Sequence, residues 1–192
     1  MIVEGLLTTV NAAGIPNIAP MGPIVQGNFR SLTLRPFRGS VTFTNLLETR
    51  AGVFHVVDRV DVIVDAVIHR LDEMPQTTPA KVVNGVVLAD CCRWVEFRIT
   101  DVDLTEERSV MSTDVLHIES RRDFLGFNRA RHAILEGAIL ATRLHILPRS
   151  EVLQSLSFLA PAVEKTGDKE ECEAFRRLTE YINERLSVES VR

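Results

Sequence analysis

The segment Trp94-Val-Glu-Phe-Arg-Ile-Thr-Asp-Val102 places Val95, Phe97 and Ile99 in strict alternation with polar residues. A period of two is typical of a β-strand with one face buried. A second strand-like run, residues 110–119, follows after a short gap. The two runs predict a β-rich region, and the sequence on either side of them indicates how far that region extends.

Short apolar segments separated by turn residues continue the pattern toward the N-terminus. They predict further strands at residues 3–10, 31–35, 53–57 and 82–89. Ser40 can cap a short helix that reaches residue 47 or 48. Because at least six short strands occur with few helices, we expect a barrel.

Proline restricts the place of one segment in that barrel. Residues 15–25 are extended in character but contain Pro16, Pro20 and Pro23. Proline has no backbone N–H, so three prolines cannot lie in a central strand. Part of this segment is therefore predicted to be an edge strand or a bulged loop.

A helical period interrupts the strands once. Val60, Val64 and Val67 are spaced by four and three, which favours a short helix. The two prolines within residues 73–79 predict a loop after it.

From Asn128 onward the period is helical throughout. Asn128 is a good N-cap for a helix running to about residue 147. Ser150 is predicted to cap a second helix, and Asp168 with Glu171 resembles the capping box of a third. The predicted fold is therefore a β-rich α+β protein, with a barrel domain over residues 1–125 and a three-helix domain over residues 126–192.

Composition excludes several classes of function. The 192 residues are 45% hydrophobic and 25% charged, which is ordinary for a globular protein, and the net charge of −4 argues against a nucleic-acid partner. The N-terminus lacks the features of a signal peptide, and charges interrupt the most apolar stretch. We therefore expect a cytoplasmic protein without a membrane partner. The histidines and cysteines lack metal-type spacing, and no metal site is expected.

The usual catalytic motifs are absent, but polar residues are crowded into the first 60 positions. They are Thr8, Thr9, Asn17, Arg35, Ser40, Thr42, Asn45 and Asp58. Arg35, Ser40 and Thr42 could hold a phosphate at the N-terminus of the short helix. The alternative is that Ser40 only caps that helix and Arg35 pairs with a carboxylate. The loop Ala19-Pro-Met-Gly-Pro23 could offer backbone groups to the polar edge of a flat heterocycle.

Five segments carry a resemblance to a known family. They are Glu4-Gly-Leu-Leu-Thr-Thr9, Gly14-Ile-Pro-Asn-Ile-Ala-Pro-Met-Gly22, Leu34-Arg-Pro-Phe-Arg-Gly-Ser40, Thr42-Phe-Thr-Asn-Leu46 and Phe127-Asn-Arg-Ala-Arg-His-Ala-Ile-Leu-Glu136. In this order and spacing they resemble the DUF447 family, which is best represented in archaea. That family has the FMN-binding split-barrel fold of the flavin reductase and pyridoxamine-phosphate oxidase superfamily. The resemblance covers nearly the whole chain.

The resemblance implies an obligate homodimer with one FMN per subunit at the interface. Carried onto this chain, it implies a phosphate site of Arg35, Ser40 and Thr42. The isoalloxazine would be lined by Thr8, Thr9, Pro20, Met21 and Gly22, with further contacts from Asn45 and Asp58. One departure is that the chain has His55-Val-Val-Asp58 where the family tends to have Asn-Val-Thr-Asp. The Thr hydroxyl is missing, so Val57 could contact the cofactor only through its backbone.

Two interpretations remain open for Asn128-Arg-Ala-Arg131. Either Asn128 or Arg129 reaches the flavin face or guides an anionic substrate, or Asn128 caps its helix and the arginines pair with the acidic third helix. We include Asn128 among the expected cofactor-binding residues.

The resulting hypothesis is an FMN-binding flavoprotein acting as an NAD(P)H- or flavin-dependent oxidoreductase or flavin reductase, with a small-molecule acceptor. FMN would carry the electron chemistry, so no general acid or base is required of the protein. The alternative is a non-catalytic FMN-binding or carrier protein. An oxidase of a phosphorylated pyridoxine-like substrate would need a second phosphate site, for which the only candidate is Asn128 to Arg131. A pterin-linked reductase is compatible with the resemblance, and no residue tests it.

Overall fold

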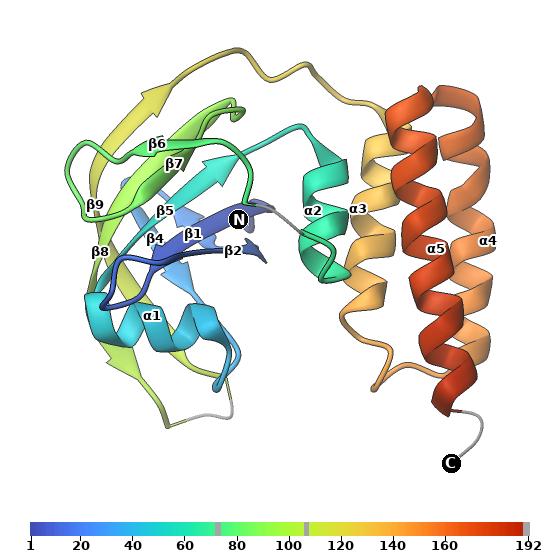
Figure 1. Ribbon diagram of the computed structural model, residues 1–192, viewed down its shortest axis with the longest axis horizontal. Helices are drawn as coiled ribbons and strands as arrows, with labels where there is room; N and C mark the ends of the chain where they lie inside the picture. Colours follow the sequence, from blue (N-terminus) through green and yellow to red (C-terminus); the bar gives the residue numbers. More distant parts are fainter. Residues whose placement is uncertain (72–73, 106–107, 190–192) are drawn as a thin grey trace. The chain divides into compact units, whose positions relative to one another are not determined.

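The computed structural model describes residues 1–71, 74–105 and 108–189. The chain forms two compact units (Figure 1). The barrel unit consists of Met1–Val57 and Glu73–Phe124, and the helical unit consists of Asp58–Asp72 and Leu125–Arg192.

A curled antiparallel sheet forms the frame of the barrel unit (Figure 1). Its strand order is β2-β1-β5-β8-β9-β4-β3. The bounds are β1 Gly5–Val10, β2 Pro16–Met21, β3 Ile24–Gln26, β4 Ser31–Leu34, β5 Ala51–Val56, β8 Arg93–Asp103 and β9 Val110–Ser120. A second, two-stranded sheet pairs β6 (Thr77–Pro79) with β7 (Val86–Leu88). The barrel predicted from the series of short strands is confirmed.

The core of this unit follows from that alternation. Leu7, Phe54, Val95, Phe97 and Met111 are fully buried in one hydrophobic cluster on the inner side of the sheet. The long strands β8 and β9 shift register twice, and such irregularities bend a strand pair and increase its twist. The bending allows the sheet to curl around its own core.

The proline-rich segment lies at the two edges of the sheet, as predicted. Pro16 and Pro20 are in β2, which is one edge strand, and Pro23 separates β2 from β3, the other edge strand. An edge strand pairs on one side only, so a missing N–H there need not remove a ladder hydrogen bond. One segment thus supplies the first and last strands of the sheet order, and residues 1–3 add backbone hydrogen bonds at the β3 end.

Helix α1 (Val41–Thr49) begins where the sequence predicts. The Ser40 hydroxyl accepts a hydrogen bond from the Phe43 backbone N–H at 3.1 Å. Arg50 ends the helix in the left-handed conformation, with a φ of 56°, and its N–H donates to the Leu46 carbonyl.

The region before β8 differs from the prediction in two respects. Residues 77–79 form β6 within the expected loop, and β7 covers only Val86–Leu88 of the strand expected over residues 82–89. The shortening has a physical cause, because the backbone N–H groups of residues 81–83 donate to the Glu96 carboxylate instead of to a neighbouring strand.

Within the described residues, the helical unit comprises α2 (Val60–Val67), α3 (Arg129–Ala141), α4 (Arg149–Thr166) and α5 (Lys169–Glu189) (Figure 1). The three C-terminal helices and the short α2 are as predicted. The sequence prediction divides the chain at 125/126, whereas the structure groups residues 58–72 with the C-terminal helices. The buried side chains of α2 account for this, because α2 packs against α3 and α5.

The ends of these helices depend on particular caps. Asn128 caps α3, and Asp168 and Glu171 form the predicted capping box of α5. Helix α3 ends at Ala141, earlier than predicted, because the Thr142 hydroxyl donates to the Ile139 carbonyl at 2.7 Å and competes with the helical ladder. The prediction for Ser150 is wrong, since α4 begins at Arg149.

Candidate functional site

The candidate site lies at the loop that connects β4 to α1. Arg35 directly follows β4, and Gly39 adopts a φ of +81° that L-residues rarely adopt. The turn is closed by a hydrogen bond from the Ser40 N–H to the Phe37 carbonyl. This turn delivers the chain to the N-cap of α1, so the short loop has a defined shape.

Arg35 is half-buried, and among the described residues its side chain has no hydrogen bond or ion pair. Two other arginines in this region, Arg38 and Arg108, do contact other groups of the protein. The Arg38 guanidinium donates to the Leu104 carbonyl, and the Arg108 guanidinium lies 4.3 Å from the Phe37 ring centroid. Arg35 therefore has its five N–H donors available for an anion. The interpretation in which Arg35 pairs with a carboxylate is not what the described residues show.

The N-terminus of α1 adds donors of a second kind. The Ser40 Oγ accepts the capping bond from Phe43, which leaves its hydroxyl hydrogen free to donate. The first N–H groups of a helix have no partner within the helix, and the first turn of α1 contains no acidic residue. A positive helix terminus that follows, within five residues, an arginine with no partner among the described residues suits a phosphate.

Thr42 and Asn45 attach this helix to the sheet. The Asn17 amide donates to the Thr42 hydroxyl at 3.0 Å, and the Asn45 amide donates to the Thr9 hydroxyl at 3.0 Å. Both helical residues are buried, and α1 packs against β1 and β2. The two bonds fix α1 across β1 and β2, and they bring together polar residues that are far apart in the sequence.

Thr8 and Thr9 are buried at about 1% exposure and have partners inside the protein. The Thr8 hydroxyl donates to the Val86 carbonyl at 2.5 Å, linking β1 to β7, and Thr9 accepts from Asn45. These hydroxyls shape the wall of the barrel from within and are not exposed to a ligand.

The Pro20-Met21-Gly22 segment lies at the edge of the sheet and is half-buried. Pro20 and Met21 pair with Leu6 and Gly5 of β1. At Gly22, an added Cβ would lie 2.6 Å from the Glu4 carboxylate oxygens, so a larger residue there would displace the exposed Glu4 side chain. In the described part of the chain no strand pairs with the outer side of β2, which leaves backbone groups there for a ligand.

The two remaining predicted residues belong to the helical unit. Asp58 is buried, accepts from the Leu125 N–H at 3.0 Å and lies 3.9 Å from the Arg131 guanidinium. Asn128 accepts from the Arg131 N–H and donates to the Thr166 carbonyl at 3.0 Å. In this structure, both side chains hold the helical unit together.

Two buried ionisable residues of the barrel unit, His55 and Glu96, were not predicted from the sequence. His55 is fully buried, and its ring bridges the Leu6 carbonyl and the Leu88 N–H, at 3.2 and 3.1 Å. Burial is the main reason that its pKa is lowered to about 4. Burial alone would raise the pKa of Glu96, but the hydrogen bonds that its carboxylate accepts from the 81–83 backbone and the Trp94 indole hold that pKa below the usual value.

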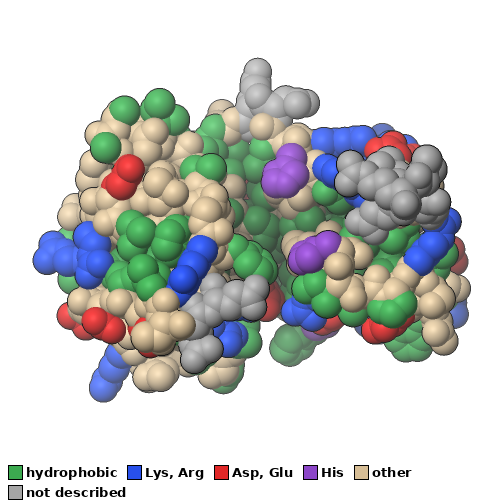
Figure 2. Space-filling view, turned by 90° about the horizontal axis from the view of Figure 1, so that it is seen from below, with side chains coloured by type: hydrophobic (Ala, Val, Ile, Leu, Met, Phe, Trp, Pro, Cys, Tyr) green, Lys and Arg blue, Asp and Glu red, His purple; other side chains and the backbone are tan. Residues whose placement is uncertain are grey.

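Exposed apolar side chains lie close to the candidate phosphate site. Phe37 and Val41, on either side of Ser40, are 57% and 61% exposed, and Leu47 is exposed further along α1. Figure 2, seen from below, shows hydrophobic side chains bordered by Lys or Arg side chains over the part of the barrel unit that carries α1. An exposed apolar surface of this kind is typical of a face that another molecule covers.

No group of three or more His, Cys, Asp or Glu side chains in residues 1–71, 74–105 and 108–189 could hold a metal ion. None of the helices in these same ranges is long and apolar enough to cross a membrane.

The curled sheet, its two edge strands and the capped helix at one end define a split-barrel protein, and solved structures share this fold. A split-barrel-domain protein from Shewanella frigidimarina is 11% identical, with 62% of this chain and 67% of that chain covered and a TM-score of 0.51. The NADH:FAD oxidoreductase of Streptomyces globisporus is 12% identical, with 62% and 76% covered and a TM-score of 0.51.

The chain belongs to the DUF447 family. The model of the family's N-terminal domain, described as "Protein of unknown function (DUF447) N-terminal domain", matches residues 3–122, and that of the C-terminal part, "Protein of unknown function (DUF447)", matches residues 128–180. An FMN-bound family member from Methanosarcina mazei is 23% identical, with 94% of each chain covered and a TM-score of 0.79. No curated protein matches the sequence. The family resemblance inferred from the five segments is confirmed.

Proposed function

We propose that this protein binds FMN in its barrel unit, with the phosphate held by Arg35 and the N-terminus of α1. The observation that carries the proposal is a half-buried Arg35 that has no partner among the described residues and precedes the Ser40 cap by five positions. A charged donor of this kind, together with a helix N-terminus, fits a phosphate monoester. The FMN-bound relative from Methanosarcina mazei supports the same ligand.

The residues divide by role in this proposal. Arg35, Ser40 and the first N–H groups of α1 would hold the phosphate, and the Thr42 hydroxyl remains able to donate. Pro20, Met21 and Gly22 would present the outer edge of β2 to the isoalloxazine. Thr8, Thr9 and Asn45 would act indirectly, because their hydrogen bonds position β1 and α1. Asp58 and Asn128 would fix the helical unit and make no direct contact.

The proposed activity is that of an NAD(P)H-dependent flavin oxidoreductase or flavin reductase. Bound FMN supplies hydride-transfer chemistry, and the protein supplies binding, orientation and shielding from water. The NADH:FAD oxidoreductase among the structural neighbours supports this class of reaction.

We further infer a cytoplasmic homodimer with the flavin at the interface. The exposed Phe37 and Val41 on either side of Ser40 support it, because a second copy covering them would also shield the phosphate site. Sedimentation of the purified protein tests this part, and a monomer at micromolar concentration with FMN bound would contradict it.

The proposal is tested on purified full-length protein. We expect flavin absorbance bands, or saturable quenching of FMN fluorescence on titration into the apoprotein, with one FMN per subunit. Addition of NADH or NADPH with an electron acceptor is expected to oxidise the nicotinamide. Absence of both bound flavin and FMN binding would contradict the proposal. FMN binding without nicotinamide oxidation would favour a carrier over an enzyme.

A further inference from the structure

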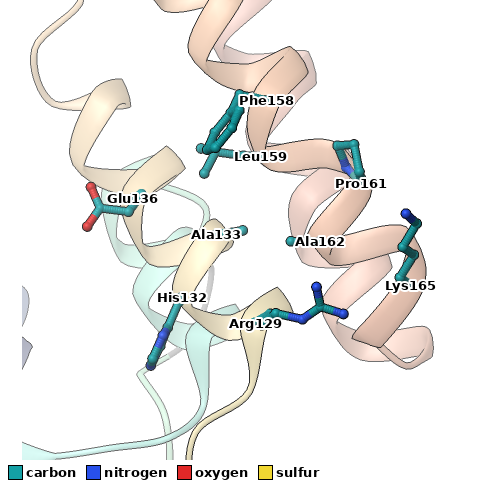
Figure 3. A pocket seen from close by; sticks show the side chains of 9 residues that line it. All are labelled: Arg129, His132, Ala133, Glu136, Phe158, Leu159, Pro161, Ala162 and Lys165. Atoms are coloured by element: carbon teal, nitrogen blue, oxygen red, sulfur yellow. The ribbon is translucent and has the colours of Figure 1, made fainter.

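A groove in the helical unit has features of a separate ligand site. It lies between α3 and α4 and has a volume of about 380 Å³, within the range of small-molecule pockets (Figure 3). The residues that line it are Arg129, His132, Ala133, Glu136, Phe158, Leu159, Pro161, Ala162 and Lys165. All of them belong to the two helices, so the groove is complete within this unit.

Small residues open the floor of the groove. Figure 3 shows Ala133 of α3 and Ala162 of α4 facing one another, where larger side chains would close the gap. Phe158 is 83% exposed, and it lines the apolar part of the groove with Leu159 and Pro161. This part of the groove suits a flat apolar group of a ligand.

Two cations stand at one end of the groove. Arg129 occupies the first turn of α3 and Lys165 the last turn of α4, and Figure 3 shows their side chains on the same side of the apolar floor. Among the described residues, neither side chain has a hydrogen bond or an ion pair. By contrast, Arg131, Arg176 and Arg177 of the same unit are each paired with a carboxylate.

The other polar groups of the groove do not neutralise this end. Glu136 is seven residues beyond Arg129, or roughly 10 Å along the helix axis. Figure 3 shows Glu136 and His132 pointing away from α4. An anion placed between Arg129 and Lys165 would therefore meet two positive charges, while the one carboxylate among the lining residues points away from α4.

We propose that the groove between α3 and α4 binds a small molecule with a flat apolar body and one carboxylate. The carboxylate would lie between Arg129 and Lys165, and the apolar body would cover Ala133 and Ala162 against Phe158. All the lining residues belong to the helical unit, so the proposal does not rest on the proposed flavin site.

The test uses the full chain with 2-naphthoate as the probe. Binding is measured by calorimetry and by the NMR shifts of the groove residues. We expect saturable binding that weakens at high salt, and much weaker binding of the neutral 2-naphthalenemethanol. Arg129→Gln and Lys165→Gln should each weaken naphthoate binding by roughly threefold to tenfold. Phe158→Ala should weaken both probes, and since the side chain is exposed this variant should fold normally.

Two matched controls separate the groove from general charge effects. Arg143→Gln removes an exposed cation of the same unit outside the groove and should leave binding unchanged. Glu136→Gln removes the one carboxylate among the lining residues and should make naphthoate binding tighter. Equal weakening in Arg143→Gln, or no saturable binding at millimolar naphthoate, would overturn the proposal. So would groove variants that alter self-association in sedimentation without altering naphthoate binding, since the groove would then be a protein contact.

Discussion

The buried imidazole of His55 makes the stability of the barrel unit depend on pH in a defined window. The ring is fully buried between the Leu6 carbonyl and the Leu88 N–H, so the neutral form is required, with Nδ1–H donating and Nε2 accepting. Burial, with a smaller contribution from the Arg121 charge, lowers the pKa from 6.5 to about 4. In the unfolded chain the ring would titrate near 6.5.

The sign of the effect follows from proton binding. Between pH 6.5 and 4 the unfolded chain binds a proton at His55 and the folded protein does not. The free energy of unfolding therefore falls as the pH falls through this window. A shift of about 2.5 units corresponds to about 3 kcal/mol in total, of which about 2 kcal/mol is lost between pH 6.5 and 4.5.

Trp94 provides a local signal for this measurement. It is the one tryptophan of the sequence, it is buried, and it pairs with His55 across β5 and β8. Urea unfolding followed by its fluorescence at several pH values reports on the barrel unit. We expect His55→Gln to be less stable at neutral pH but to lose the pH dependence above 4.5, while the exposed His132→Gln keeps it. Wild-type stability that is flat between pH 4.5 and 6.5 would refute the reasoning.

Three further predictions concern contacts that position the candidate site and the helices. Glu96→Ala leaves three backbone N–H groups and the Trp94 indole without their acceptor, and it should lower the free energy of unfolding, measured in urea, by about 3 kcal/mol. Glu96→Gln should lower it by less. Equal stability of the wild type and both variants would contradict this. Ser40→Ala should lose about 1 kcal/mol of stability and also weaken FMN binding, and Ser40→Thr should restore both; normal FMN affinity in Ser40→Ala would exclude the hydroxyl from the site. Arg177→Ala breaks the pair with Asp65, at 3.0 Å, that joins α5 to α2, and should lower the free energy of unfolding of the helical unit by about 1 kcal/mol, with hydrogen exchange fastest in α2; unchanged exchange there would show that the pair is unimportant.

Local patterns in the sequence were sufficient for most of the fold. The alternation of residues 94–102 predicts β8 because a strand with one buried face needs only a period of two. Ser40, Asn128 and Asp168 predict helix starts because a cap acts within three residues of itself. The three prolines of residues 15–25 predict an edge because each removes a donor.

Other features depend on contacts that no local pattern contains. Glu96 occupies a polar position of an alternating strand, yet it is buried, because the distant backbone of residues 81–83 supplies its donors. Helix α2 is surrounded in sequence by strands, and only its packing against α3 and α5 assigns it to the helical unit.

In the candidate site, too, some features follow from local sequence and others depend on distant contacts. The sequence predicts Arg35 and Ser40 as an anion-binding pair, but whether Arg35 is already neutralised depends on the folded chain. The sequence also groups Thr8, Thr9 and Asp58 with them, and the structure gives these side chains partners of their own. Hydroxyl and carboxylate groups in one stretch of sequence do not reveal which of them point into the protein.

The central claim is that Arg35 holds the phosphate of FMN, and an affinity comparison tests it most directly. FMN is titrated into the apoproteins of the wild type and of two variants, Arg35→Ala and Arg98→Ala. The second variant is the control, because Arg98 is an exposed arginine on β8. Loss of a charge-assisted bond of about 1.5–3 kcal/mol predicts roughly 10- to 150-fold weaker binding for Arg35→Ala, and wild-type binding for Arg98→Ala. Riboflavin, which lacks the phosphate, should bind the wild type and Arg35→Ala equally. An unchanged dissociation constant of FMN for Arg35→Ala would contradict the claim.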